Sequence, residues 1–168
     1  ADARALVLRI DSPGGTVVGS EALYLALRRV AEEKPVVAVM GEVAASGGYV
    51  AAIAAEHIVA RQNTLTGSIG VILEYPEISG LLDDLGVEVV TIRSSDVKGG
   101  ASPLRELSPA ERAAQERIVA DANAWFRELV AERRGFRAAA IEVVADGSAF
   151  TGRMAVENGL IDAFGGVR

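Results

Sequence analysis

The sequence predicts an α/β domain in which most strands run parallel. Segments of strand composition alternate with segments of helical periodicity along most of the 168 residues, which is the order expected when helices connect parallel strands. Several of the predicted strands are apolar throughout, as in strands that are buried on both faces of a sheet. A chain of 168 residues is long enough to enclose one core, and half of its residues are apolar and can fill that core. We therefore predict a single domain over residues 1–168.

The first third of the chain alternates between the two kinds of segment. Residues 5–11, ALVLRID, form a predicted strand that ends in a Pro/Gly turn. Residues 18–33 place their apolar side chains on one helical face, which predicts a helix. Residues 35–40, PVVAVM, are an apolar strand, and residues 46–56 form a short, almost wholly apolar helix that should be buried. The next predicted strand is residues 57–61.

The middle of the chain is less regular. Residues 64–73, TLTGSIGVIL, are predicted as an extended segment that glycines interrupt. Residues 77–86 form a predicted helix that ends at Gly86, and residues 87–92, VEVVTI, a further strand. Residues 94–103, SSDVKGGASP, show no apolar period, so we predict a polar loop.

The last third of the chain opens with a capping box. In SPAE, residues 108–111, Ser108 is the predicted N-cap, Pro109 the first helical residue and Glu111 the third. The helix that starts there should run to Arg134. A second helix is predicted over residues 137–145, and TGRMAVENGLID adds a short helix and a final strand.

The composition excludes several classes of function. The net charge is −6 and no basic block stands out, which argues against a nucleic-acid partner. The chain has one histidine and no cysteine, so the usual zinc ligands are lacking, and we predict no metal and no other cofactor. The longest apolar run, around residues 50–55, is far shorter than the roughly 20 residues that a membrane span needs.

Ser46 is a candidate nucleophile. It stands in a run of small residues, GEVAASGGYVAAI, at a predicted strand-to-helix turn. Gly47 and Gly48 leave the neighbouring backbone N–H groups unobstructed, which suits an oxyanion site, and the dipole of the following helix favours developing negative charge. A second turn, SPGG at residues 12–15, offers further N–H groups. A small serine that only lets a helix pack closely would have the same neighbours.

A nucleophilic serine needs a proton acceptor, and the candidates are few. His57, the one histidine, lies at the far end of the same short helix beside apolar residues, which is typical of a strand edge. Carboxylates and lysines remain, because arginine stays protonated, and Lys34 and Lys98 are the two lysines. Lys34 ends a helix, where its charge complements the dipole. Lys98 lies in the polar loop and is a candidate base if burial makes it neutral; otherwise it is an exposed loop lysine.

Five motifs, taken in order, resemble the serine–lysine peptidases of family S49, of the signal peptide peptidase A type. They cover the chain nearly end to end, and five motifs in the same order are far more specific than any one alone. The motifs are RIDSPGGTV, AASGGYVAAIAAEHIVA, TLTGSIGVI, SSDVKGGASPLRELSPAE and GSAFTGRMAVENGLIDAFGG.

The resemblance implies a role for individual residues. Ser46 matches the family nucleophile. Lys98, 52 residues downstream, matches the general base of the short, single-domain members. Ser68, in the TGS motif, matches a serine that holds the lysine in place. The N–H groups of Gly14 and Gly47 match the oxyanion donors.

The resemblance also implies a fold, an activity and a setting. The fold is a ClpP/crotonase-like α/β spiral of mostly parallel strands with flanking helices. The activity is that of a serine endopeptidase that cleaves hydrophobic peptides such as signal-peptide remnants, in a homo-oligomeric ring that encloses the sites. Members carry a transmembrane anchor and at least one strand before the SPGG strand. We therefore expect a domain truncated at its N-terminus, whose missing anchor holds it at the cell membrane, outside the cytoplasm.

Three alternatives stay open. The first is a capsid-maturation or other peptidase of the same superfamily. The second is a crotonase-type acyl-CoA enzyme, which also uses paired backbone N–H groups but would not need Ser46 together with Lys98. The third is a non-catalytic ring subunit, against which the retained Ser46, Ser68 and Lys98 argue.

Overall fold

The computed structural model describes residues 3–167, which form two compact units. Among the described residues, the first unit comprises residues 3–70 and 123–167, and the second comprises Val71–Ala122. The long helix α4 (Pro109–Arg134) contributes its first turns to the second unit and its last turns to the first. The single domain predicted over residues 1–168 stays a prediction.

The first unit is built on a six-stranded sheet whose strands run mostly parallel. The central strand β2 (Val36–Ala45) pairs in parallel with β1 (Leu6–Ser12), β3 (His57–Ala60) and β4 (Leu65–Gly67). Strand β6 (Ala163–Phe164) adds to β3 in parallel. Among the described strands, β5 (Ala149–Thr151) alone is antiparallel to its neighbour, which is β4. The predicted α/β class with mostly parallel strands is confirmed.

Strand β2 is longer than the sequence pattern indicates, because the Asp11 side chain bonds the β2 backbone where its pairing with β1 shifts register. The apolar pattern ends at Met40, and the pairing of β1 with β2 shifts register beyond that residue. There the Asp11 carboxylate accepts the N–H groups of Glu42 and Val43, both at 3.1 Å. Gly41 leaves room for that carboxylate, since a Cβ at Gly41 would lie 2.6 Å from its Oδ2. The strand therefore continues to Ala45, and its end presents the next residue, Ser46.

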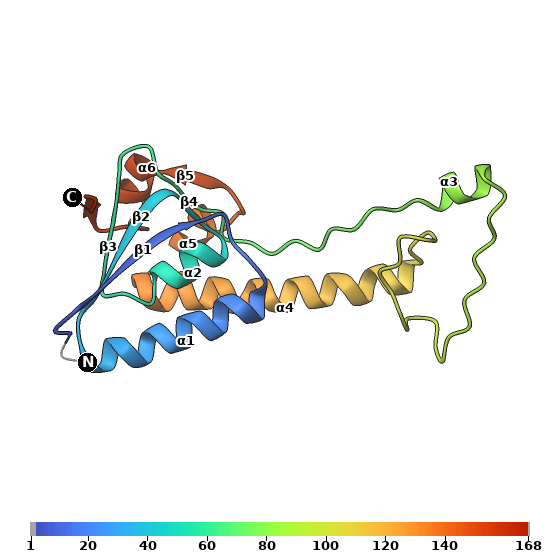
Figure 1. The fold of residues 1–168 in the computed structure, drawn as a ribbon, viewed down its shortest axis with the longest axis horizontal. Helices are drawn as coiled ribbons and strands as arrows, with labels where there is room; N and C mark the ends of the chain where they lie inside the picture. The colour runs from blue at the N-terminus through green and yellow to red at the C-terminus, as the bar shows by residue number, and fades with distance from the viewer. Residues whose placement is uncertain (1–2, 168) are drawn as a thin grey trace. The chain divides into compact units, whose positions relative to one another are not determined.

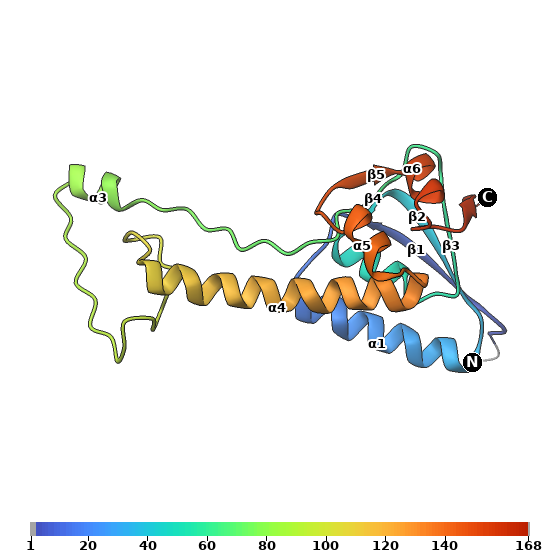
Figure 2. The same ribbon diagram turned by 180° about the vertical axis from the view of Figure 1, so that it is seen from behind.

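Helices of the first unit enclose one apolar core. Helix α1 (Val17–Glu33) begins at Thr16, whose hydroxyl accepts the Gly19 N–H at 3.2 Å. The short helix α2 (Gly47–Ala52) lies between α1 and the strands β1 and β2 (Figure 1). It is nearly all buried, as predicted, because it faces protein on every side. Phe126 and Val130 of α4 complete the same core. Figure 2 shows α1, α2 and the strands from behind.

Helices α5 (Ala138–Val144) and α6 (Gly152–Glu157) lie in the C-terminal part of the first unit. Both match predicted helices, as α1 and α4 do. Helix α2 is shorter than the predicted residues 46–56, and the predicted extended segment 64–73 forms only the three residues of β4. Within residues 3–167, no helix combines the length and the apolar character that crossing a bilayer requires.

The second unit contains the short helix α3 (Ser79–Asp84), the first turns of α4 and extended segments between them. The chain leaves α3 through Gly86, whose φ is 70°. The strand predicted over residues 87–92 is wrong, because these residues pair with no described strand. A strand needs a hydrogen-bonded neighbour and a covered face, whereas Val90 is 77% exposed and Ile92 is 95% exposed.

Candidate active site

Ser46 stands at the turn from β2 into α2 with φ 52° and ψ −120°. A positive φ is uncommon for a residue with a Cβ, and strained residues of this kind cluster at functional sites. The backbone holds Ser46 there from both sides. Its N–H donates to the Gly67 carbonyl at 2.9 Å, and its own carbonyl accepts the N–H groups of Tyr49 and Val50. A sharp turn from a strand into a helix exposes the hydroxyl of a nucleophilic serine.

Gly14, in the SPGG turn, packs directly against Ser46. A Cβ at Gly14 would lie 3.0 Å from the Ser46 Cβ and 3.2 Å from its Oγ. The φ of Gly14 is 137°, which also favours glycine. The Gly14 N–H donates to the Ser12 hydroxyl at 3.3 Å, which is longer than the usual N–H···O distance. A stronger acceptor beside Ser46 can therefore compete for this N–H.

The ASGG and SPGG turns fit together through their glycines. A Cβ at Gly47 would collide with the Ser20 hydroxyl and would lie 3.2 Å from the Gly15 nitrogen. A Cβ at Gly48 would lie 2.7 Å from the Ser12 carbonyl oxygen. Within the part of the chain that the structure describes, the Gly47 N–H donates to no protein acceptor. Two backbone N–H groups beside one serine hydroxyl are what an oxyanion site requires.

Ser68 follows the end of β4 at the same level as Ser46 follows the end of β2. The two strands are parallel, and Ala45 pairs with Gly67, so the next residue along each strand is a serine. The φ of Ser68 is 48°, and Ser46 and Ser68 are the two non-glycine residues with a positive φ among those described. The Ser68 N–H donates to the Ser148 carbonyl at 2.8 Å. Both serines are half-buried.

Helix α2 is fixed at both ends, which makes the turn at Ser46 rigid. The hydroxyl of the fully buried Tyr49 donates to the Leu160 carbonyl at 2.8 Å. Burial raises the pKa of Tyr49 above its ordinary value, so the hydroxyl stays a donor. Beyond the last turn, Arg133 donates to the carbonyls of Ile53 and Ala55 at 2.8 and 3.1 Å.

Lys98 belongs to the second unit, in the predicted polar loop. Its N–H donates to the Ser95 carbonyl at 3.2 Å, which closes a turn, and its side chain is exposed. Gly99 continues the loop with φ 80°. Since Ser46 and Lys98 lie in different units, their pairing stays a prediction.

His57 is the first residue of β3 and half its side chain is exposed. Its Nδ1 lies 3.6 Å from Oδ2 of Asp162. Burial raises the pKa of Asp162, whereas the hydrogen bonds from Arg134 and from the Ile58 N–H lower it. The lowering effect is the larger, so the pKa of Asp162 is below its ordinary value. His57 is thus part of a surface polar cluster at a strand end, as its apolar sequence neighbours indicate.

Two serines that shape the site are not among the residues predicted from the sequence. The Ser12 hydroxyl accepts the Gly14 N–H, and the Ser20 hydroxyl fills the space beside Gly47. Ser12 lies inside the SPGG motif, whereas Ser20 carries no sequence signal of its own, since it comes from the first turn of α1. Within residues 3–167, no three His, Cys, Asp or Glu side chains gather as metal ligands would.

Comparison with known proteins gives one family and several relatives. Residues 28–168 match the family described as "Peptidase family S49". The chain is 42% identical over 161 residues to "Putative protease slr0021" of Synechocystis sp.. It is 40% identical over 167 residues to "Serine protease SPPA, chloroplastic" of Arabidopsis thaliana, and 37% identical over 163 residues to "Protease 4" of Salmonella typhi.

The matched region is nearly the whole of this chain but only part of each relative. It covers 96%, 98% and 96% of this chain, in the same order, and 58%, 24% and 26% of the three relatives. The likeness therefore concerns the region that holds the ASGG, SPGG and TGS turns.

Proposed function

The chain belongs to peptidase family S49, of the signal peptide peptidase A type, and on this premise we propose a serine peptidase in which Ser46 is the nucleophile and Lys98 the general base. One observation carries the proposal. Ser46 has a positive φ at the end of β2, and Gly14 lies against its hydroxyl. Among the described residues the Gly47 N–H has no protein acceptor, and the Gly14 N–H is held by one long bond to Ser12. A strained serine beside two such N–H groups is suited to attack on a carbonyl.

In the first half of the reaction, neutral Lys98 takes the proton of the Ser46 hydroxyl while Oγ attacks the carbonyl carbon of the peptide bond. The carbonyl oxygen becomes an oxyanion that accepts the N–H groups of Gly14 and Gly47. Protonated Lys98 then gives its proton to the leaving nitrogen as the C–N bond breaks. The products are a free amine and an acyl group esterified to Ser46.

In the second half, Lys98 takes a proton from a water molecule that attacks the ester carbon. The same two N–H groups stabilise the second oxyanion. Collapse of this intermediate returns the proton from Lys98 to Ser46 Oγ and releases the peptide with a new carboxyl end. Ser68, at the level of Ser46 on the neighbouring strand, is proposed to orient the Lys98 amine by a hydrogen bond.

The proposed substrates are extended hydrophobic peptides such as signal-peptide remnants, by likeness to the family motifs. The proposed assembly is a homo-oligomeric ring at the cell membrane, with the catalytic domain outside the cytoplasm. Several large apolar side chains of the second unit are exposed in the single chain, and contact with further copies would bury them. They include Ile72 at 86%, Val90 at 77% and Ile92 at 95% exposure.

Labelling with a fluorophosphonate tests the nucleophile, because only an activated serine reacts with it. We expect one label per chain, on the peptide that contains Ser46, and none in Ser46→Ala. Ser148→Ala is the matched control, since Ser148 is an exposed serine of the same unit; it should label as the wild type does. A label on another residue, or no label on a chain that cleaves peptides, would overturn the assignment of Ser46 as the nucleophile. A chain that neither takes the label nor cleaves peptides would favour the acyl-CoA or non-catalytic alternatives.

A further inference from the structure

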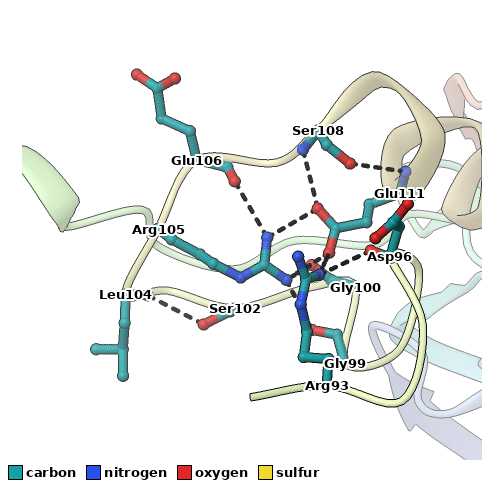
Figure 3. A network of polar contacts seen from close by, with 10 residues as sticks. All are labelled: Arg93, Asp96, Gly99, Gly100, Ser102, Leu104, Arg105, Glu106, Ser108 and Glu111. Atoms are coloured by element: carbon teal, nitrogen blue, oxygen red, sulfur yellow. Dashed lines mark hydrogen bonds and ion pairs between the residues drawn. The ribbon is translucent and has the colours of Figure 1, made fainter. Parts of the chain in front are cut away.

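Glu111, near the start of α4, is a charged side chain with no exposure to solvent. Four donors meet its two oxygens, as Figure 3 shows: Arg93 and Arg105 bond Oε1, while Arg105 at 2.8 Å and the Ser108 N–H at 3.0 Å bond Oε2. Hydrogen bonds from Arg105 lower the pKa of Glu111 well below its usual range, so the carboxylate stays ionised. A buried charge is tolerated when it is paired in this way.

The capping box at the helix start does not require the arginines. Its two reciprocal bonds are complete without them, because the Ser108 N–H donates to Glu111 and the Glu111 N–H donates to the Ser108 hydroxyl at 3.3 Å. A neutral glutamine can serve the same box. The charge of Glu111 is therefore not explained by the capping box, and what it does in addition is to bind Arg93 and Arg105.

The two arginines come from opposite sides of the loop that carries Lys98. Arg93 lies five residues before Lys98 and Arg105 seven residues after it. Arg93 also donates to the Asp96 carbonyl at 2.7 Å. Arg105 reaches the carbonyl of Gly99 at 3.4 Å. One buried carboxylate thus orients two guanidinium groups that hold backbone carbonyls on both sides of Lys98 (Figure 3).

A third contact seats the loop on α4. Gly100 is buried, and its carbonyl also faces Arg105 at 3.5 Å. A Cβ at Gly100 would lie 2.7 Å from Nε2 of Gln115, so the chain approaches the helix as closely as glycine allows. Arg93 and Arg105 thus hold the backbone on both sides of Lys98, whereas the Lys98 side chain itself is exposed.

We propose that Glu111 is a positioning residue for Lys98, acting through Arg93 and Arg105 on the backbone of the loop. The inference rests on the proposed function in one respect, the role of Lys98 as the base. A loop with adjacent glycines has many conformations in the absence of such contacts. Holding its backbone reduces the entropy lost when the amine is brought to its reacting position, and misplacement by about 1 Å can cost about 100-fold in rate.

Glu111→Gln is the sharpest test, because it keeps the acceptor for the capping box and removes the charge that pairs with the arginines. We expect kcat on a peptide substrate to fall roughly 10–100-fold, with KM changed less than about threefold. Glu116→Gln is the matched control, an exposed glutamate on the same helix, and should leave both constants unchanged. Arg105→Lys provides a milder variant, which keeps the charge but lacks the two-pronged geometry.

Two further measurements separate positioning from general destabilisation. Hydrogen exchange of residues 94–103 should quicken in Glu111→Gln and in Arg105→Lys, while exchange in β2 stays as in the wild type. In a Lys98→Ala background, Glu111→Gln should not lower the residual activity further, because the group that it positions is gone. Unchanged loop exchange, or an undiminished effect in that background, would overturn the proposal.

The two proposals fail in different ways. Wild-type activity in Lys98→Ala would overturn the general base, and with it the catalytic purpose of the loop anchor. The exchange measurement does not depend on the chemistry, so it alone reports whether Glu111 holds the loop.

Discussion

The backbone N–H of Ser46 donates a 2.9 Å hydrogen bond to the carbonyl oxygen of Gly67. This bond continues the pairing of β2 with β4 one residue beyond the pair Ala45–Gly67. The ASGG turn and the TGS turn are therefore joined by backbone, and Ser46 and Ser68 cannot shift along their strands independently.

Ser68→Ala should lower kcat by about 10–1000-fold, the range typical of positioning and acid–base groups. The fold should be kept, because the substitution removes only a hydroxyl from a half-buried residue. Steady-state kinetics and a thermal unfolding curve measure the two effects. Ser148→Ala serves as the control, and a change below twofold in Ser68→Ala would make Ser68 a packing residue.

Gly14→Ala should lower kcat by about 100-fold or more, since a methyl group would press on the Ser46 hydroxyl and displace one proposed oxyanion donor. Alanine at a φ of 137° is also strained, so the substitution should reduce the free energy of unfolding by about 1–3 kcal/mol. Gly80→Ala is the matched control, because a Cβ at Gly80 would meet nothing within 4 Å. Full activity in Gly14→Ala would exclude the Gly14 N–H from the reaction.

The pH dependence of kcat identifies the base. If Lys98 accepts the proton, activity should rise with pH to a neutral or alkaline optimum, because only the neutral amine is a base. Lys98→Arg should be as inactive as Lys98→Ala, since arginine stays protonated. His57→Gln should keep most of the activity and the same profile. An ascending limb near pH 6.5 that disappears in His57→Gln would assign the base to histidine instead.

Asp162 should contribute stability that acid removes. Its pKa in the folded chain is below the ordinary value of 3.8, so the unfolded chain binds this proton more readily. The contribution is fully present above that value and is lost as pH falls through the folded pKa. In urea unfolding, Asp162→Asn should cost about 1–2 kcal/mol near pH 6 and less near pH 3.

Two comparisons make the acid prediction specific. Asp121→Asn, an exposed residue of α4, should leave the free energy of unfolding within about 0.5 kcal/mol of the wild type. If the cost of Asp162→Asn is the same at both pH values, the bonds from Arg134 and Ile58 do not depend on the charge of Asp162.

Features that depend on neighbouring residues are predictable from the sequence. The capping box of Ser108 and Glu111 and the end of α4 at Arg134 depend on residues within a few positions of each other. The apolar composition of the residues after Ser46 predicts a buried helix, and α2 is buried. The strand predicted over residues 87–92 failed because residue type indicates only what suits a sheet, and pairing depends on a neighbour elsewhere in the chain.

The α/β class, the order of most elements and the family can be predicted from the amino-acid sequence, because periodicity, caps and motifs are properties of neighbouring residues. Three features of the site emerge with the folded chain: Gly14 lies against Ser46, Ser68 stands level with Ser46, and β2 reaches Ala45 beside the carboxylate of Asp11. The sharing of the Glu111 charge by arginines on both sides of Lys98 also depends on the fold. Such contacts join residues distant in sequence, and their geometry is set by strand register and burial, which no local pattern contains.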